Sequence, residues 1–234
     1  MFEGIWITST YALVFLSPHL CSALLSTAGA PPWLPATGFL QLLPGESQTL
    51  SVPPDWTGRL WGQTLCNQVS GSSTTAGRFS CATGHCSPAE CPIGGTATTL
   101  AEFTLNGGAG AGRLNAYLVS LVHGFNLPMA VVTWGGTAGN CTESGSFIDL
   151  NENCPRELRV VYSERTVGCR SPCEVFGEPY YYCTAWKYSD GAASGDCKAN
   201  SYSEFFGGSC PLGSLTFTCA SKDYIVSFCP SSRY

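Results

Sequence analysis

The residues best suited to chemistry stand in one short stretch, 77–91, which reads G-R-F-S-C-A-T-G-H-C-S-P-A-E-C. Cys81, Cys86 and Cys91 are spaced five residues apart, and His85 stands beside the second of them. Thiolates and an imidazole at such spacing can bind a zinc ion. In an oxidising compartment the same cysteines instead close short loops through disulfides. The rest of the chain has to decide between the two.

The cysteine content of the whole chain favours disulfides. Fourteen cysteines are spread over 234 residues, and no C-x2-C pair occurs among them. Zinc sites commonly draw on such pairs, whereas many cysteines spread along a chain are typical of secreted proteins. We therefore expect a secreted, disulfide-braced protein that holds no metal ion and no cofactor.

The low charge of the chain argues against a nucleic-acid-binding surface. Only 12% of residues are charged, the formal net charge is −5, and no run of basic residues is present. Binding to nucleic acid requires clustered Lys and Arg. No stretch reaches the roughly 18 apolar residues of a membrane span. We expect a monomer that binds no nucleic acid and does not span a membrane.

The N-terminal segment, residues 1–23, allows two interpretations. The short apolar run Tyr11–Leu16 is typical of a secretory signal, but Glu3 precedes it and no basic residue does. The alternative makes Thr10–Leu16 a first β-strand. Both interpretations stay open, and we treat 1–23 as a signal or irregular segment that precedes a domain at 24–234.

Short β-prone runs bounded by glycine and proline recur along this domain, a pattern typical of a β-sandwich. The predicted strands are Ser47–Val52, Arg59–Gln63, Leu100–Leu105, Tyr117–Val122, Met129–Thr133, Leu158–Tyr162, Leu215–Cys219 and Tyr224–Phe228. Helix signals are scarce, and only Ser171–Phe176 and Tyr202–Phe206 are predicted as helical turns. We expect the cysteine-rich region from Cys154 to Cys210 to be a loop-rich subdomain held by bridges rather than by its own core.

Many segments, in order along the chain, resemble the thaumatin-like, or pathogenesis-related class 5, proteins of plants. The matching segments include Leu24–Pro32, Thr37–Phe39, Trp56–Cys66, Gly77–Cys91, Ala97–Leu105, Val119–Met129, Gly136–Cys141, Phe217–Cys219 and Tyr224–Pro230. The chain is thereby identified as a divergent plant member of that family. The resemblance implies an all-β fold, a flattened thaumatin-like β-sandwich with two smaller disulfide-rich lobes at approximately 64–97 and 148–210.

The resemblance also implies a set of disulfides. The implied pairs are Cys66–Cys81, Cys86–Cys91, Cys141–Cys219, Cys154–Cys169 and Cys183–Cys197. Leu16, Ser146 and Tyr182 stand where the family has further cysteines. These departures leave four cysteines unpaired or in non-standard bridges, namely Cys21, Cys173, Cys210 and Cys229. Bridges between Cys21 and Cys229, or between Cys173 and Cys210, stay open as alternatives.

Many family members carry an acidic cleft, formed by an Arg, a Glu and three Asp and linked to binding or slow hydrolysis of β-1,3-glucans. In this chain Glu102 fits the Glu and Arg59 the Arg, although Gln63 occupies another commonly basic position. Leu118 and His123 stand where two of the aspartates would lie, and the segment that carries the third is shorter. The resemblance therefore implies a cleft with ligand contacts at Arg59, Glu102 and His123 and with most of its carboxylates missing.

Glycoside hydrolysis usually needs two carboxylates, about 5–5.5 Å apart for retention or about 6.5–9.5 Å apart for inversion. We therefore expect an antifungal, defence-related binder of fungal cell-wall β-glucan with little or no hydrolysis, located in the apoplast or the vacuole. The alternatives are a weak endo-β-1,3-glucanase that uses Glu102 as its acid, and an eroded family copy without function. Structural roles compete with these: Glu102 as an ion-pair partner of Arg59, and His123 as a loop histidine.

One modification motif stands apart from the cleft. Asn140-Cys141-Thr142 is an N-glycosylation sequon, and we note Asn140 as a candidate acceptor. The cysteine at its centre belongs to an implied disulfide.

Overall fold

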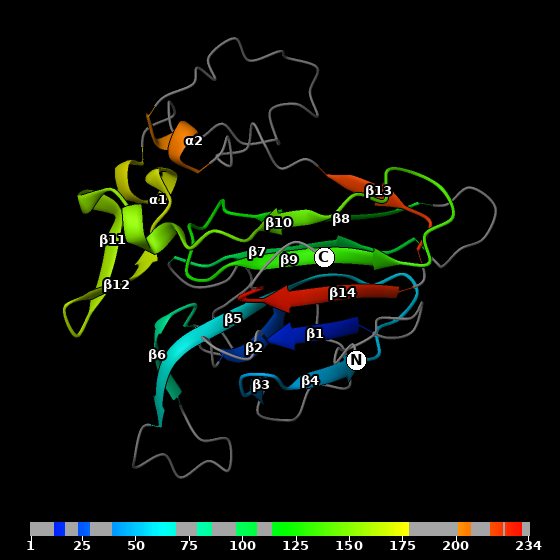
Figure 1. The fold of residues 1–234 in the computed structure, drawn as a ribbon, viewed down its shortest axis with the longest axis horizontal. Helices are drawn as coiled ribbons and strands as arrows, with labels where there is room; N and C mark the ends of the chain where they lie inside the picture. The colour runs from blue at the N-terminus through cyan, green and yellow to red at the C-terminus, as the bar shows by residue number, and fades with distance from the viewer. Residues whose placement is uncertain are drawn as a thin grey trace.

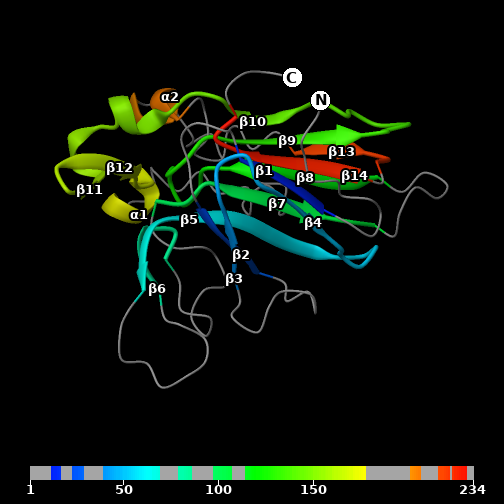
Figure 2. The same ribbon diagram turned by 60° about the horizontal axis from the view of Figure 1, so that its bottom comes forward.

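The computed structural model of this chain describes residues 12–16, 23–28, 39–68, 79–85, 97–106, 114–177, 201–206, 216–221 and 223–230. Within them, two large sheets lie against each other, and smaller elements stand at one end of the pair (Figures 1 and 2). The fold is an all-β sandwich, as the sequence predicts.

The first sheet has five strands. Its order is β10 (Ser144–Ser146), β9 (Met129–Trp134), β14 (Asp223–Phe228), β1 (Ala12–Leu16) and β4 (Ser47–Leu50). Strand β1 runs parallel to β14, with Leu16 opposite Phe228, and antiparallel to β4, with Ala12 opposite Leu50. Ala12–Leu16 is therefore a strand inside this sheet.

The second sheet has seven strands. Its path is β13 (Phe217–Cys219), β8 (Asn115–Ser120), β7 (Leu100–Thr104), β5 (Thr57–Gln68), β2 (Ala23–Ala28) and β3 (Phe39–Leu42), and β6 (Phe79–Thr83) pairs with β5 off this path. Strand β5 is long enough to belong to two parts of the molecule: Thr57–Trp61 pairs with β7 in the sandwich, and Thr64–Gln68 pairs with β6 in a hairpin that leaves the sandwich (Figure 1).

The core between the sheets is rich in aromatic side chains. Leu60, Phe103, Tyr117 and Tyr224 are each at most 3% exposed. Tyr224 lies at the centre, with its ring centroid 5.4 Å from those of Phe103 and Tyr117. Contacts of this kind stabilise a core beyond the area that they bury. Because successive side chains on a strand point to opposite faces, the rings of Phe103 on β7 and Tyr117 on β8 lie on the same side of their sheet, toward Tyr224.

The smaller elements at one end of the sandwich form a second packed unit. They are the 3-10 helices η1 (Leu150–Asn153) and η2 (Arg156–Leu158), the hairpin β11 (Arg159–Tyr162) and β12 (Arg165–Cys169), and the helices α1 (Pro172–Phe176) and α2 (Ser201–Phe205). Both predicted helical turns are present, at α1 and α2.

This unit shares an apolar cluster with a loop of the sandwich, in addition to its Cys154–Cys169 bridge. Phe125, Leu158 and Phe206 are each at most 3% exposed and lie in one apolar cluster, which is separate from the core between the sheets. The partly buried side chains of Phe176 and Tyr202 pack against this cluster. Two short helices and a loop from the sandwich supply these residues. Their burial therefore depends on tertiary packing, which a local sequence pattern does not predict.

Three of the five bridges implied by the family resemblance are present: Cys66–Cys81, Cys141–Cys219 and Cys154–Cys169, with S–S distances of 2.04, 1.96 and 2.00 Å. The implied pairs Cys86–Cys91 and Cys183–Cys197 lie outside the described residues, as do Cys21 and Cys210. Cys173 is buried in α1. Cys229 is bonded in a disulfide whose second cysteine lies outside the described residues, so of the two alternatives for Cys229, unpaired or in a non-standard bridge, the unpaired one does not hold.

The turn of the β11–β12 hairpin carries backbone strain. Ser163 and Glu164 have positive φ angles of 47° and 65°, and Tyr162 lies opposite Arg165 across the turn. Two central residues with positive φ define a type I′ turn, which favours Asn and Gly because other side chains crowd the backbone there. The hairpin therefore forms in spite of its turn residues, with Cys154–Cys169 and the apolar cluster beneath it.

Replacing Glu164 with glycine should stabilise the protein. Removal of the side chain relieves a left-handed conformation that costs about 1–2 kcal/mol, and the extra entropy of the unfolded chain offsets about 0.5–1 kcal/mol of that gain. We expect a net increase of up to about 1 kcal/mol in the free energy of unfolding, measured by urea denaturation. Glu152→Gly, in η1 and without positive φ, is the matched control and should destabilise; equal destabilisation by both changes would contradict the strain.

The buried tyrosines make stability fall at alkaline pH. Burial raises the pKa of Tyr117 to about 12 and raises the pKa of Tyr224 as well. In the unfolded chain tyrosine loses its proton near pH 10. Above about pH 10 the unfolded state therefore releases these protons while the folded state keeps them, and the free energy of unfolding decreases with pH.

We expect urea midpoints that fall as pH rises from about 10 to about 12. In Tyr117→Phe the overall stability should be lower, but the decline with pH should be shallower because one of the linked protons is gone. An unchanged slope in Tyr117→Phe would show that burial of this hydroxyl does not govern the alkaline limit.

Candidate functional site

A row of three residues crosses the outer face of the seven-stranded sheet. The register places Arg59 on β5 opposite Glu102 on β7, and Glu102 opposite Leu118 on β8. Leu60 follows Arg59 on β5, and Ala101 precedes Glu102 on β7. Both side chains point into the core and are fully buried. Because successive side chains on a strand point to opposite faces, the row Arg59–Glu102–Leu118 lies on the face away from the core.

Arg59 and Glu102 form an ion pair on this face. The Arg59 Nε lies 3.1 Å from the Glu102 Oε2, and the two side chains are 33% and 25% exposed. Gln63, the other position that the resemblance offers for the basic residue, is 5% exposed and lies farther along β5, opposite Leu24 on β2. The geometry therefore identifies Arg59 as the basic partner of Glu102.

The exposed part of this face ends one row farther along the strands. Trp61, Leu100 and Ser120 are opposite one another on β5, β7 and β8, and each is at most 3% exposed. The Trp61 Nε1 donates to the backbone oxygen of Gly84, just after β6. The hairpin of β5 and β6 thus covers this end of the face. Arg59–Glu102–Leu118 is the first row open to solvent, and the next row, Thr57–Thr104–Ala116, is open as well.

His123 lies in the loop that follows β8 and is held by a different partner. Its Nδ1 is 2.8 Å from the Glu174 Oε1 on α1, and the side chains are 18% and 33% exposed. The backbone oxygen of His123 accepts from the backbone N–H of Thr98, just before β7. The printed sequence gives no signal for the contact with Glu174, 51 residues away. No hydrogen bond or ion pair in the described part of the chain joins His123 to Glu102.

Asn126 links the open face to both smaller units. Its Nδ2 donates to the backbone oxygen of Gly62 on β5 at 2.8 Å and to the Thr83 Oγ1 on β6 at 3.0 Å. Its Oδ1 accepts from the backbone N–H of Thr99, and its backbone oxygen accepts from the Asn151 Nδ2 in η1. Asn126, which is 4% exposed, therefore connects strands of the sheet and the β5–β6 hairpin through its side chain, and it reaches the unit that carries α1 through its backbone oxygen.

Sequence reasoning does not single out Asn126, although Val119–Met129 is one of the segments that resemble the family. A buried amide that uses its donors and its acceptor can be recognised only when the four partners are known to converge. The same holds for Glu174, which the sequence places in a helical turn and nowhere near a site.

The stretch 77–91 does not offer the zinc site that its spacing allows. The Cys81 sulfur is bonded to Cys66, so it is no thiolate ligand, and His85 is exposed. Cys86 and Cys91 lie outside the described residues. Among the residues that the structure describes, no group of three His, Cys, Asp or Glu side chains is arranged to hold a metal ion.

Replacing Asn126 with alanine should destabilise the molecule strongly. The change removes one hydrogen bond each from Gly62, Thr83 and Thr99, of which Thr83 keeps its bond to the Thr64 hydroxyl, and a buried polar group left without a partner costs about 1–3 kcal/mol. We expect a loss of more than about 2 kcal/mol in the free energy of unfolding by urea denaturation. The matched control is Asn67→Ala, which removes one exposed 3.3 Å hydrogen bond to the Tyr162 hydroxyl and should cost about 0.5 kcal/mol or less. Similar losses in the two variants would refute the linking role of Asn126.

Comparison with known proteins gives a consistent result. The profile of the Thaumatin family matches residues 18–230. Thaumatin-like protein 1 of Arabidopsis thaliana is 39% identical over 209 residues, which are 83% of this chain and 76% of that protein. Pathogenesis-related thaumatin-like protein 3.5 of Cryptomeria japonica is 36% identical over 235 residues, covering 94% of this chain and 91% of that protein.

A solved structure, that of the thaumatin-like xylanase inhibitor TLXI, covers 97% of this chain and 99% of its own, with 18% identity and a TM-score of 0.46.

Proposed function

Because the chain belongs to the thaumatin family, we propose that it is a secreted, defence-related plant protein that binds fungal-wall β-glucan with little or no hydrolysis. The observation that carries this proposal is the row Arg59–Glu102–Leu118 on the open face of the sheet. It combines a charged hydrogen-bonding pair with an apolar neighbour, at the end of a rigid scaffold.

The row suits the chemistry of a sugar ring. A carboxylate accepts hydrogen bonds from hydroxyl groups, and a guanidinium donates several in one plane. The side chains of Arg59 and Glu102 are 33% and 25% exposed, so a ligand on this face can reach both. Leu118, partly buried beside them, offers an apolar surface to the C–H groups of a sugar.

The same row is poorly equipped for hydrolysis. The cross-strand neighbours of Glu102 are Arg59 and Leu118, so no carboxylate stands directly beside it on β5 or β8. Its Oε2 accepts a hydrogen bond from the Arg59 guanidinium, so this oxygen is engaged within the row. His123 is engaged with Glu174 on α1 and does not supply a nucleophilic carboxylate. Neither of the two groups that glycoside hydrolysis needs, a carboxylic acid and a second carboxylate, is therefore supported at this row.

Secretion is supported by the covalent structure. Three complete disulfides and the bonded Cys229 fit an oxidising compartment, which in a plant is the secretory pathway with the apoplast or vacuole at its end. No described helix is both long and apolar enough to cross a bilayer.

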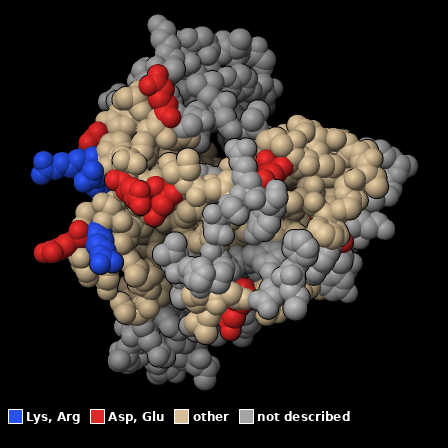
Figure 3. All heavy atoms as spheres, in the orientation of Figure 1, with Lys and Arg blue, Asp and Glu red and all other residues tan. Residues whose placement is uncertain are grey.

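The described surface carries little positive charge in the view of Figure 3. Basic side chains there lie at the edge occupied by β11 and β12, and acidic ones form small separate groups. Four of the five described basic residues, Arg156, Arg159, Arg165 and Arg170, belong to this region. They alternate with Glu157 and Glu164, so this edge does not form the single-sign field that steers polyanions.

The binding role can be tested with insoluble β-1,3-glucan. We expect the wild-type protein to be retained, and Glu102→Gln and Arg59→Gln each to weaken retention about tenfold or more, since a hydrogen bond to a charged group is worth about 1.5–3 kcal/mol. Glu152→Gln, an exposed carboxylate on η1, is the matched control and should bind like the wild type. Thermal melts of all four proteins confirm that each is folded.

Equal retention of all variants would reject this face as the binding site, and failure of the wild type to bind would reject the ligand. Laminarin incubated with the same preparations should release no reducing sugar above the buffer control. Release that disappears in Glu102→Gln would instead establish the weak glucanase.

A further inference from the structure

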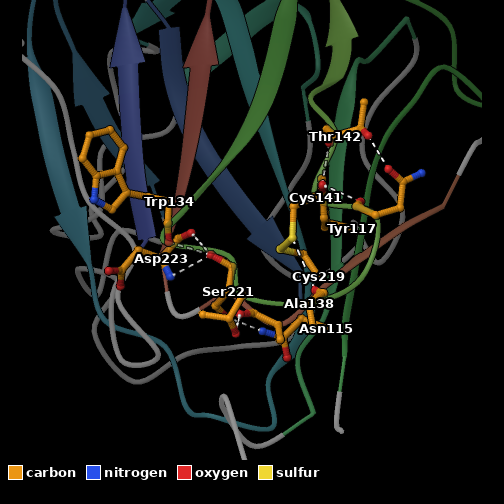
Figure 4. The surroundings of a disulfide bond; sticks show 12 residues. Asn115, Tyr117, Trp134, Ala138, Cys141, Thr142, Cys219, Ser221 and Asp223 are labelled. Carbon is orange, nitrogen blue, oxygen red and sulfur yellow. Dashed lines mark hydrogen bonds between the residues drawn. A yellow bond between two sulfur atoms is a disulfide. The ribbon is translucent and has the colours of Figure 1, made fainter.

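The loop 135–142 holds a glycosylation sequon against a disulfide. Cys141 is bonded to Cys219 at the end of β13 (Figure 4). The backbone carbonyl groups of the residues on both sides of Cys141 face the hydroxyl of Tyr117. The Tyr117 Oη donates to the Thr142 oxygen at 2.5 Å and lies 3.5 Å from the Asn140 oxygen. The loop is thus fixed through its backbone, which leaves the side chains of Asn140 and Thr142 exposed.

We propose that the native protein carries an N-linked glycan on Asn140 next to an intact Cys141–Cys219 bridge. In the reaction, the Asn140 Nδ2 forms a bond to the anomeric carbon of a lipid-diphosphate-linked oligosaccharide. The bond from that carbon to the diphosphate oxygen breaks, the lipid diphosphate leaves, and the amide loses one proton. Thr142 supplies the hydroxyl that the sequon requires.

The folded structure accommodates such a glycan. The Thr142 Oγ1 donates to the Asn140 Oδ1, so the described bond of this amide uses its oxygen and not the nitrogen that would carry the sugar. The loop lies along β13, which is the edge strand of the seven-stranded sheet. It contacts that edge through the Ala220 N–H, which donates to the Ala138 oxygen, and through the pairing of Gly139 with Cys219. Asn140 follows directly and is exposed to solvent.

The disulfide does not prevent the modification, because of the order of synthesis. Cys219 follows Cys141 by 78 residues, so the sequon is complete and reachable before the partner thiol exists. The bridge forms later, when the two thiols pass two electrons and two protons to an oxidised disulfide donor of the secretory pathway. The hydrogen bonds of Tyr117 go to backbone oxygens, which the glycan leaves untouched.

Two glycines next to the bridge show how closely the loop is fitted. A Cβ on Gly136 would lie 2.5 Å from the Cys219 sulfur and 2.6 Å from the Cys141 sulfur, and a Cβ on Gly139, whose φ is +93°, would lie 2.4 Å from the Thr218 oxygen. Glycosylation of Asn140 adds atoms on the solvent side only, whereas a bulkier residue at either glycine would add them on the side of the disulfide.

The test uses the full chain expressed in plant cells, with total cell extract and secreted protein analysed together so that misfolded variants are still counted. We expect a peptide-N-glycosidase to shift the wild-type protein to lower mass. The shift should be lost in Asn140→Gln and Thr142→Ala and kept in the matched variant Thr142→Ser. Under non-reducing conditions, mass spectrometry should find the glycan on a peptide that contains Asn140 and is bonded to the peptide of Cys219.

A wild-type protein without glycan would overturn the proposal, even if Cys219→Ser were modified, because the bridge would then have closed first. A glycan found only on molecules with a reduced Cys141 would overturn it as well. Occupancy in Cys219→Ser that equals or exceeds that of the wild type, together with a modified and bridged wild type, supports the order of events. These measurements of glycan and disulfide do not depend on whether the protein binds glucan.

Discussion

The placement of the open face depends on one buried amide. Asn126 lies where the long strand β5 leaves the sandwich, and it binds backbone or hydroxyl groups of Gly62, Thr83 and Thr99 while Asn151 binds its backbone. A buried amide is stable only when its donors and its acceptor are matched, and here all of them are. These directional bonds, together with the backbone pairing of Phe125 with Cys169, help to set the angle between the sheet and the smaller units, since apolar contacts alone carry little directional preference.

The disulfides act at a different level from this polar junction. Cys66–Cys81 and Cys154–Cys169 each close 15 residues inside one unit, and Cys141–Cys219 spans 78 residues between a loop and β13. In the loop-entropy account each short bridge contributes about 3 kcal/mol and the long one about 4.5 kcal/mol, by restricting the unfolded chain. They hold each part together, while the hydrogen bonds of Asn126 orient the parts relative to one another.

The elements that the sequence predicts are those whose local pattern is sufficient. All eight predicted strands and both helical turns are present within a few residues, because a short β-prone run bounded by turn residues is a local signal. Strands β2, β3, β6, β10 and β12 are not predicted: β6 lies inside the cysteine-rich stretch that reads as loops, and β10 has three residues. The partners of Asn126 and His123 are distant in sequence, and the bridges follow from the family resemblance rather than from spacing. The local sequence pattern therefore does not predict which residues distant in sequence form hydrogen bonds or disulfides with one another.

The register of β5, β7 and β8 explains how the fold can be kept while the residues on the outer face of the sheet change. The core side of β5, β7 and β8 is set by Leu60, Ala101 and Tyr117, and the opposite side tolerates any residue that does not disturb that packing. Leu118 can therefore replace a carboxylate beside Glu102 at no cost to the core. Glu102 pairs with Arg59, and no second carboxylate stands beside it on β5 or β8 to share hydrolysis. Fold and activity separate along the two sides of the same strands.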